Sequence, residues 1–224
     1  MRLREAFAEL LFPTRCAGCD APGALLCARC EADLPLISPA DACPRCGAPY
    51  GRLLCTECWQ REWAFSATLS LGEFETSLAR AVVLHKDAGE RRLAGVLGAL
   101  LAARVREAWP DWPEGVAFVP ATAVALRRRG FDHGRAIAET VASALGVPLL
   151  SALERSAARD QRTLGRSARA ANAAGSFSAS GPVPCRLLLT DDVFTTGATL
   201  DAAASALLVA GAAEVRCATV ARAW

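Results

Sequence analysis

The sequence predicts an α/β protein in which a small cysteine-rich module precedes an open parallel sheet with helices on both faces. Three observations support this fold class. Eight of the ten cysteines lie between residues 16 and 58, where large apolar residues are few. Further along, short apolar runs alternate with helical patterns, which is the order of βα units and therefore of parallel strands. The last such unit, near residues 187–210, joins an apolar run, two carboxylates, a hydroxyl-rich loop and a helix.

Composition and charge limit the classes of function. The chain has 224 residues, of which 53% are hydrophobic, enough for a core in one domain with an added small module. The formal net charge of +2 creates no overall field that would attract nucleic acid or an anionic membrane. Glu5 and Glu9 interrupt the apolar run that a signal peptide would need, and no run is long enough to span a membrane. We therefore expect a cytoplasmic protein with no membrane insertion, in a reducing compartment.

Residues 1–62 are expected to form a zinc-ribbon module. Leu3 and Phe7 fit one face of a short helix, and four C-x-x-C pairs follow. The eight cysteines are Cys16, Cys19, Cys27, Cys30, Cys43, Cys46, Cys55 and Cys58. Each pair can direct two thiolates at one metal, and two pairs complete a tetrahedral site, so two structural Zn²⁺ ions are predicted. Sequential pairing is favoured over interleaved pairing because the loops within each half are short. A disulfide or redox framework is the alternative, against which the missing export signal argues.

Residues 63–224 are expected to form the sheet domain. Residues 65–75 are predicted to form short strands, and residues 76–84 and 90–108 to form helices. Two Trp-Pro pairs end the second helix, and residues 116–119 form a buried strand. Ala121 and Thr122 follow this strand at its carboxyl end, where ligands of open α/β sheets usually bind.

The remaining elements alternate in the same way. A helix over 132–145 is predicted by its apolar face and by Gly146 as its stop, and a strand is predicted over 147–153. Residues 187–189 are an unbroken leucine run, as expected of a central strand covered on both faces. A helix over about 200–210 and a strand over about 214–221 close the domain.

Two adjacent carboxylates, Asp191 and Asp192, are expected where the central strand ends. They are costly there unless polar groups meet them, and the two hydroxyls of a sugar diol can donate to both. The loop that follows supplies hydroxyls and a flexible glycine: Thr195, Thr196, Gly197 and Thr199. Its hydroxyl and N–H groups can surround a phosphate at the positive end of the next helix. The alternative is a plain strand–loop–helix turn with solvated aspartates.

Two arginine-rich stretches could serve this site. Arg128 lies in a run of three arginines that could meet a pyrophosphate, since guanidinium groups match phosphate oxygens; a solvated charge run is the alternative. Residues 155–175 carry five arginines, Arg162 and Arg166 among them. This segment could close over a phosphosugar, form a solvated helix, or bind single-stranded nucleic acid. It contains no aromatic residue for base stacking, so the first role is slightly favoured over nucleic-acid binding.

The segment from the leucine run to Thr199 resembles the ribose-phosphate signature of the type I phosphoribosyltransferases, Asp-Asp-x-x-Thr-Thr-Gly-x-Thr after an apolar strand. The resemblance implies that Asp191 and Asp192 are catalytic residues that hold the ribose hydroxyls of phosphoribosyl pyrophosphate (PRPP). It also implies that a loop cradles the 5′-phosphate, namely Val193, Phe194, Thr195, Thr196, Gly197, Ala198 and Thr199. Mg²⁺ would accompany the ligand, held largely by the oxygens of the ligand itself.

The whole chain resembles the ComF family of competence-associated proteins, which join a double zinc ribbon to a phosphoribosyltransferase-like domain. Beyond the four cysteine pairs and the Asp191–Thr199 loop, the marks are Lys86, Gly89, Pro120, Arg128, Gly130, Phe131, Gln161, Leu164, Arg169, Asn172 and Phe177. Two positions depart from the family pattern. Asp87 follows Lys86 where tyrosine is usual, and Asp132-His133 stands where Asn-Gln is usual. His133 is expected to hydrogen-bond at a helix start rather than to act as a base.

These resemblances imply a phosphoribosyltransferase, in which a nitrogen nucleophile displaces pyrophosphate from PRPP, linked to DNA uptake or to nucleotide metabolism. The intact phosphosugar loop favours this enzymatic hypothesis. The alternative is a non-catalytic module of competence that senses a phosphosugar or binds single-stranded DNA, with DNA or competence proteins as partners. No residue in the sequence indicates the acceptor.

Overall fold

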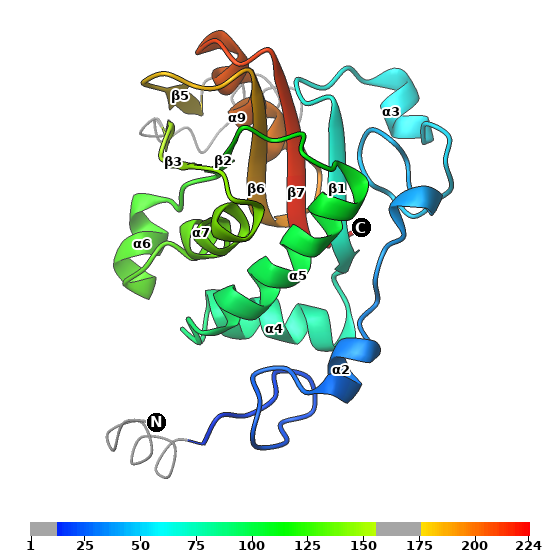
Figure 1. The fold of residues 1–224 in the computed structure, drawn as a ribbon, viewed down its shortest axis with the longest axis vertical. Helices are drawn as coiled ribbons and strands as arrows, with labels where there is room; N and C mark the ends of the chain where they lie inside the picture. The colour runs from blue at the N-terminus through cyan, green and yellow to red at the C-terminus, as the bar shows by residue number, and fades with distance from the viewer. Residues whose placement is uncertain (1–12, 156–175) are drawn as a thin grey trace, which may run out of the picture.

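The computed structural model describes residues 13–155 and 176–224 (Figure 1). The helix predicted around Leu3 and Phe7 lies outside the described residues. So do most of the arginine-rich segment, including Arg162 and Arg166, and the family marks from Gln161 to Asn172.

A five-stranded parallel sheet forms the centre of the molecule, in the order β1-β7-β6-β2-β3. The strands are β1 (Ala67–Glu73), β2 (Gly115–Phe118), β3 (Leu149–Leu150), β6 (Arg186–Phe194) and β7 (Glu214–Arg222). Leu187, Leu188 and Leu189 of β6 are fully buried, as expected for a central strand covered on both faces. The α/β class with an open parallel sheet is therefore confirmed.

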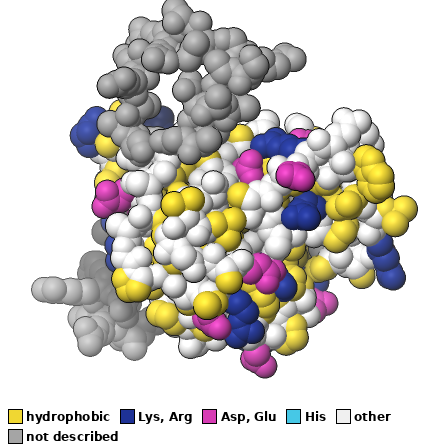
Figure 2. All heavy atoms as spheres, turned by 90° about the horizontal axis from the view of Figure 1, so that it is seen from above, with side chains coloured by type: hydrophobic (Ala, Val, Ile, Leu, Met, Phe, Trp, Pro, Cys, Tyr) yellow, Lys and Arg dark blue, Asp and Glu magenta, His cyan; other side chains and the backbone are white. Residues whose placement is uncertain are grey.

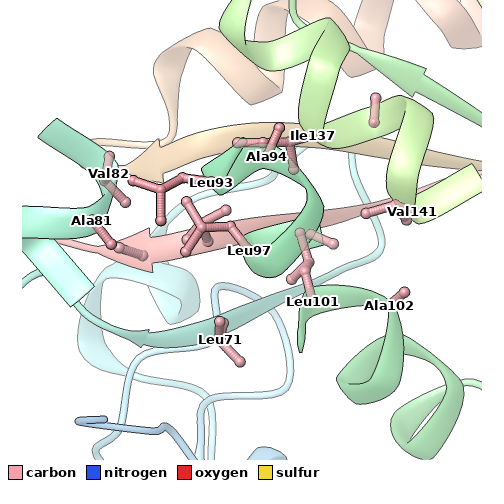
Figure 3. Close-up of a cluster of buried hydrophobic side chains, with 14 of the residues drawn as sticks. Leu71, Ala81, Val82, Leu93, Ala94, Leu97, Leu101, Ala102, Ile137 and Val141 are labelled. Atoms are coloured by element: carbon pink, nitrogen blue, oxygen red, sulfur yellow. The ribbon is translucent and has the colours of Figure 1, made fainter. Parts of the chain in front are cut away.

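Three helices cover one face of the sheet, as Figure 1 shows. They are α4 (Thr76–Lys86), α5 (Leu93–Ala108) and α7 (His133–Leu145). Their apolar stripes meet over Leu71, Val116 and Leu188 of the sheet. Figure 3 shows part of this core, where Val82 of α4, Leu97 of α5 and other apolar side chains come together. This contact buries the apolar face that each helix would otherwise expose to water.

One helix, α9 (Ala198–Val209), covers the opposite face. Leu200, Ala203 and Leu207 of this helix pack against the side chains of β6 and β7 that point to this face, including Cys217, which is fully buried. Trp63 and Phe65, which precede β1, complete this second core with stacked rings 4.9 Å apart. Helices therefore lie on both faces of the sheet, as predicted.

The cysteine-rich part of the chain packs against the sheet and against α4. Its short helices are α2 (Ala28–Ala32), the 3-10 turn η1 (Pro39–Asp41) and α3 (Thr56–Gln60). The segment between the two halves adds to the free edge of β1, where Leu36 forms an antiparallel bridge with Gly72. Arg80 of α4 donates to the carbonyl of Gly18, and Arg222 of β7 donates to the carbonyl of Cys46 at 2.9 Å. Each half thus shares packing with the sheet domain.

The rest of the fold differs in detail from the sequence prediction. The strand predicted over 147–153 is split into β3 and β4 (Leu153–Arg155), and β4 pairs antiparallel with β5 (Phe177–Ala179) outside the main sheet. A short helix, α6 (Ala123–Arg129), precedes α7. Across residues 13–155 and 176–224, we find no helix whose length and apolar character would let it cross a bilayer.

Candidate functional site

The two aspartates lie inside β6 rather than after it. β6 remains paired with β7 as far as Phe194, whereas its pairing with β2 stops at Thr190. Asp191 and Asp192 therefore occupy the carboxyl edge of the sheet on the β2 side only. The sequence prediction ended the strand too early because the two neighbours of β6 have different lengths. Each carboxylate accepts the backbone N–H of the following residue, at 2.9 Å from Asp192 and 2.8 Å from Val193.

Asp192 is buried, and two basic side chains face it. Oδ2 of Asp192 lies 2.5 Å from Nζ of Lys86, at the end of α4, and 3.3 Å from Nε2 of His133, at the start of α7. Both basic groups pair with this oxygen and lower the pKa of the carboxyl, and a carboxylate oxygen has several lone pairs, so it can still accept a further hydrogen bond. The cluster thus holds a charged carboxylate with an acceptor position available to a ligand.

The pKa values of the two carboxyl groups move apart. Burial and the charge of Asp192 raise the pKa of Asp191 to about 8. Burial also disfavours the charged form of Asp192, but His133 and Lys86 outweigh it and hold its pKa below the usual range. At neutral pH the pair therefore carries one negative charge, on Asp192, and Asp191 is mostly protonated.

The loop after β6 turns back over Trp63 into α9. Gly197 has a φ of 73° and caps the N-terminus of α9. A Cβ atom at this position would lie 2.6 Å from Cζ of Phe194 and 2.6 Å from Cζ3 of Trp63, so only glycine fits. Thr195, Thr196 and Thr199 are exposed beside the first turn of α9. The amides of that turn have no partner within the helix, which is the local arrangement for binding an anion.

The loop after β2 is held by local hydrogen bonds. Oδ2 of Asp132 accepts the N–H of Ala121 at 2.9 Å, and Oγ1 of Thr122 accepts the N–H of Ala125 at 3.1 Å and so caps α6. Arg155 donates to the carbonyl of Pro120 at 2.7 Å and lies close enough for its charge to act on Asp191. The structure thus places this loop beside the carboxyl edge, with the Ala121 amide already in use and the hydroxyl of Thr122 still able to donate a hydrogen bond.

Sequence reasoning did not find the pairing of Asp192 with Lys86 and His133. Lys86 was noted only as a mark before a helix, and His133 only as a hydrogen-bonding residue at a helix start. A second histidine, His85, places the start of α7 by contacting the carbonyl of His133 at 3.2 Å. Arg128 forms an ion pair with Asp87 at 2.9 Å. These contacts depend on how α4, α6 and α7 pack, and no local pattern encodes that.

The eight cysteines of the ribbon module form two clusters with sequential pairing. One cluster is Cys16, Cys19, Cys27 and Cys30, and the other is Cys43, Cys46, Cys55 and Cys58, with the sulfurs of each within 4.8 Å of one another. Cys19 and Cys27, like Cys46 and Cys55, have sulfurs 3.7 Å apart. Sulfurs bound to one zinc at about 2.3 Å in a tetrahedron lie about 3.8 Å apart.

Backbone amides further prepare these clusters for metal. The N–H of Cys27 points at Sγ of Cys16 at 3.3 Å, and the N–H of Cys55 points at Sγ of Cys43 at 3.4 Å. Burial opposes ionisation, but such amides lower the pKa of Cys16 to about 6 and that of Cys43 to about 7. Thiolates are the form that binds zinc. The residues therefore fit two structural Zn²⁺ ions.

Comparison with known proteins agrees with this arrangement. Residues 7–59 match the double zinc ribbon domain family. The DNA utilization protein YhgH of Salmonella typhi is 29% identical over 220 residues, which are 92% of this chain and 96% of that protein. YhgH of Escherichia coli (strain K12) is 27% identical with the same coverage. The competence protein ComFC of Streptococcus pneumoniae is 25% identical over 194 residues, or 85% of this chain and 84% of that protein.

A solved adenine phosphoribosyltransferase from Leishmania tarentolae also matches in structure. It is 15% identical, and the match covers 69% of this chain and 91% of that one with a TM-score of 0.38.

Proposed function

The chain belongs to the ComF family, in which a double zinc ribbon precedes a phosphoribosyltransferase-like domain, and from this premise we propose that the carboxyl edge of its sheet binds PRPP in DNA uptake or nucleotide metabolism. The observation that carries the proposal is the pair Asp191 and Asp192 followed by the Thr195–Thr199 turn into α9. On the carboxyl edge of the sheet, two carboxylates that can bind a diol are followed directly by a turn that can bind a phosphate.

The buried acceptor oxygen of Asp192 supports a polar ligand. Oδ2 of Asp192 is out of contact with solvent and is paired with Lys86 and His133, which keep the carboxyl charged. A charged carboxylate accepts stronger hydrogen bonds than a neutral group, so a ribose hydroxyl that donates to Asp192 would gain binding free energy. Asp191, held protonated beside it, loses its proton more easily when cations or hydroxyl donors of the ligand arrive.

Each part of the site has a role in the proposed transfer. The two aspartates orient the ribose, and the threonine hydroxyls and first-turn amides of α9 hold the 5′-phosphate. Lys86 and His133 keep Asp192 charged and in place. A Mg²⁺ ion held mainly by oxygens of PRPP would offset negative charge on the pyrophosphate leaving group.

A direct test is a thermal shift of the full chain with PRPP and Mg²⁺, followed by an assay of pyrophosphate release with pooled nucleobases. A rise in melting temperature with PRPP supports the binding site, and pyrophosphate release supports the enzymatic reading. A rise without release favours a phosphosugar sensor. An unchanged melting temperature at millimolar PRPP rejects the proposal.

A second candidate function is the binding of single-stranded DNA, and exposed aromatic residues of the second cysteine cluster favour it. Trp59 is 78% exposed and Tyr50 is 70% exposed, and the Tyr50 ring lies 5.0 Å from the ring of Trp224. Such rings give bases a surface for stacking, which the arginine-rich segment lacks. On the face seen in Figure 2, basic and acidic side chains are interspersed, so that face offers a nucleic acid no single strongly positive surface.

A further inference from the structure

A polar pocket opens beside the aspartate cluster. Its volume is about 610 Å³, and it lies between the turn that follows α4 and the turn that joins α6 to α7. It is lined by Lys86, Asp87, Ala88, Gly89, Arg128, Arg129 and Phe131. Neither Ala121 nor Thr122, where we expect the pyrophosphate of PRPP, belongs to this lining. The pocket is therefore adjacent to the proposed sugar site but separate from the loop after β2.

The lining carries an excess of positive charge. Three of its side chains are cationic and only Asp87 is acidic. A single oxygen of Asp87, Oδ1, accepts hydrogen bonds from both arginines, at 2.9 Å from Arg128 and 3.0 Å from Arg129. One carboxylate cannot satisfy two guanidinium groups, each of which has five N–H donors. The pocket therefore keeps donors and positive charge that suit an oxyanion.

Arg129 provides an independent sign of a missing partner. Its side chain is only 10% exposed, and its Nε is buried without a hydrogen-bond acceptor. Burying an unpaired guanidinium donor is unfavourable, so an anion in the pocket would stabilise the positive charge that Arg129 brings to its wall. Arg91 adds further positive charge, since its guanidinium lies 4.7 Å over the ring of Phe131 and donates to the carbonyl of Gly130.

We infer that this pocket is an oxyanion site that receives a phosphate or carboxylate group of the second substrate, an inference that rests on the proposed PRPP site. Lys86 connects the two sites, because it lines the pocket and its Nζ lies 2.5 Å from Oδ2 of Asp192. A second substrate must sit next to the ribose to attack it, and this adjacency provides that position. Arg128 is thereby assigned to the second substrate rather than to the pyrophosphate of PRPP.

The test compares Arg128→Ala with Arg135→Ala. Both arginines are exposed and ion-paired, with side-chain exposures of 67% and 52%, but only Arg128 lines the pocket. Calorimetry measures inorganic phosphate binding to the PRPP-saturated full chain, in which the 5′-phosphate loop is blocked. We expect Arg128→Ala to weaken phosphate binding about tenfold or more, Arg128→Lys to restore part of it, and Arg135→Ala to leave it unchanged. PRPP affinity stays within about twofold in all three variants.

Matched acceptors then test the second-substrate assignment. Pyrophosphate release is compared for nicotinate and nicotinamide, and for orotate and uracil, which are acidic and neutral acceptors of similar shape. We expect release with the acidic member of at least one pair, and its loss in Arg128→Ala. Release with neutral members alone, or none with any acceptor while phosphate still binds, overturns that assignment.

The remaining outcomes separate this inference from the proposed function. Equal phosphate affinity in Arg128→Ala and the parent overturns the oxyanion site. A loss of PRPP affinity in Arg128→Ala as large as the loss of phosphate affinity also overturns the inference, because the pocket would then hold the pyrophosphate. If the parent binds no PRPP, the proposed function and the second-substrate role fail together. Phosphate titration of the ligand-free variants then decides the oxyanion site alone.

Discussion

Lys86 and Asp192 form the contact that joins the first helix of the sheet domain to its central strand, with Nζ of Lys86 2.5 Å from Oδ2 of Asp192. Lys86 is the only lysine in the chain. Its side chain is 30% exposed, whereas that of Asp192 is 6% exposed. The lysine therefore pairs its positive charge with a buried carboxylate while part of its own side chain remains in solvent. Structure and proposed function therefore depend on the same pair.

Replacing the lysine should destabilise the fold. Lys86→Met removes the cation but keeps much of the side-chain volume, and it leaves Asp192 with His133 as its remaining basic contact. We expect the free energy of unfolding to fall by about 1–3 kcal/mol, measured by urea denaturation. Combined with Asp192→Asn, the two changes should not add, and the coupling should be about 1 kcal/mol or more. The exposed pair Arg135 and Glu139 is the control, with an expected coupling below about 0.5 kcal/mol.

The raised pKa of Asp191 predicts a pH dependence of stability. Its pKa is about 8 in the folded protein against a reference value of 3.8. Between about pH 4 and pH 8 the folded chain thus holds a proton that the unfolded chain has lost, and stability falls as pH rises through this range. Asp192 has a lowered pKa, so its stabilising effect is complete above about pH 5 and adds no slope between pH 5 and pH 8.

Asp191→Asn should remove this slope. Unfolding free energies at pH 5 and pH 8 give the measurement, with the parent losing more stability than the variant as pH rises. Thr199→Ser, which changes an exposed residue nearby without adding or removing a titratable group, is the control and should follow the parent. Parallel curves for the parent and Asp191→Asn would show that Asp191 ionises normally in the folded protein.

Loss of zinc from the ribbon module should also lower the stability of the sheet domain. Cys43→Ser should release one of about two bound Zn²⁺ ions per chain, measured by metal analysis. Cys43 and Cys46 share a buried core with Phe65 and Phe194, and Arg222 of β7 donates to the carbonyl of Cys46. We therefore expect the sheet domain to lose stability as well.

A melting transition of the sheet domain that is unchanged in Cys43→Ser would contradict this packing argument. Absence of zinc from the parent protein, with the thiols oxidised in pairs, would contradict the metal assignment itself. The boundary between residues 62 and 63 stays a prediction, which limited proteolysis of the zinc-loaded chain can locate.

Binding of single-stranded DNA should depend on the exposed aromatic residues if that candidate function holds. Trp59→Ala removes a ring that is 78% exposed, and stacking of one base is worth about 1–3 kcal/mol. Oligonucleotide affinity, followed by fluorescence anisotropy, should fall about fivefold or more. Val209→Ala on α9 is the control, because Val209 is also exposed and apolar. Equal oligonucleotide affinities for Trp59→Ala and the parent would show that Trp59 is not part of a DNA-binding surface.

Local patterns made some features predictable and left others out of reach. The leucine run, the cysteine pairs and the Asp191–Thr199 turn are contiguous, so their order in the sequence is enough to place them. The pairing of Lys86 and His133 with Asp192 joins three separate elements, and only the packing of α4 and α7 on β6 creates it. The extent of β6 likewise depends on the length of its neighbour β7, and no residue of β6 encodes that.

The aspartate pair provides the strictest test of PRPP binding. In Asp191→Asn with Asp192→Asn, each side chain keeps its shape but loses the capacity to become a charged acceptor for a ribose hydroxyl. A hydrogen bond to a charged group is worth about 1.5–3 kcal/mol, so losing two should weaken PRPP binding by about a hundredfold or more. The measurement is the rise in melting temperature with PRPP and Mg²⁺, which should be present in the parent and absent from the variant.

The stability of the ligand-free variant separates this effect from misfolding. Removing Asp191 relieves a carboxyl group whose ionisation burial disfavours, whereas removing the charge of Asp192 leaves Lys86 without its ion pair. The two effects oppose each other, so we expect a change in unfolding free energy within about 2 kcal/mol. The single variant Asp192→Asn should lose more PRPP affinity than Asp191→Asn at pH 7, because Asp192 alone is charged before the ligand arrives. Equal PRPP-induced shifts in the parent and the double variant would mean that the ribose lies elsewhere.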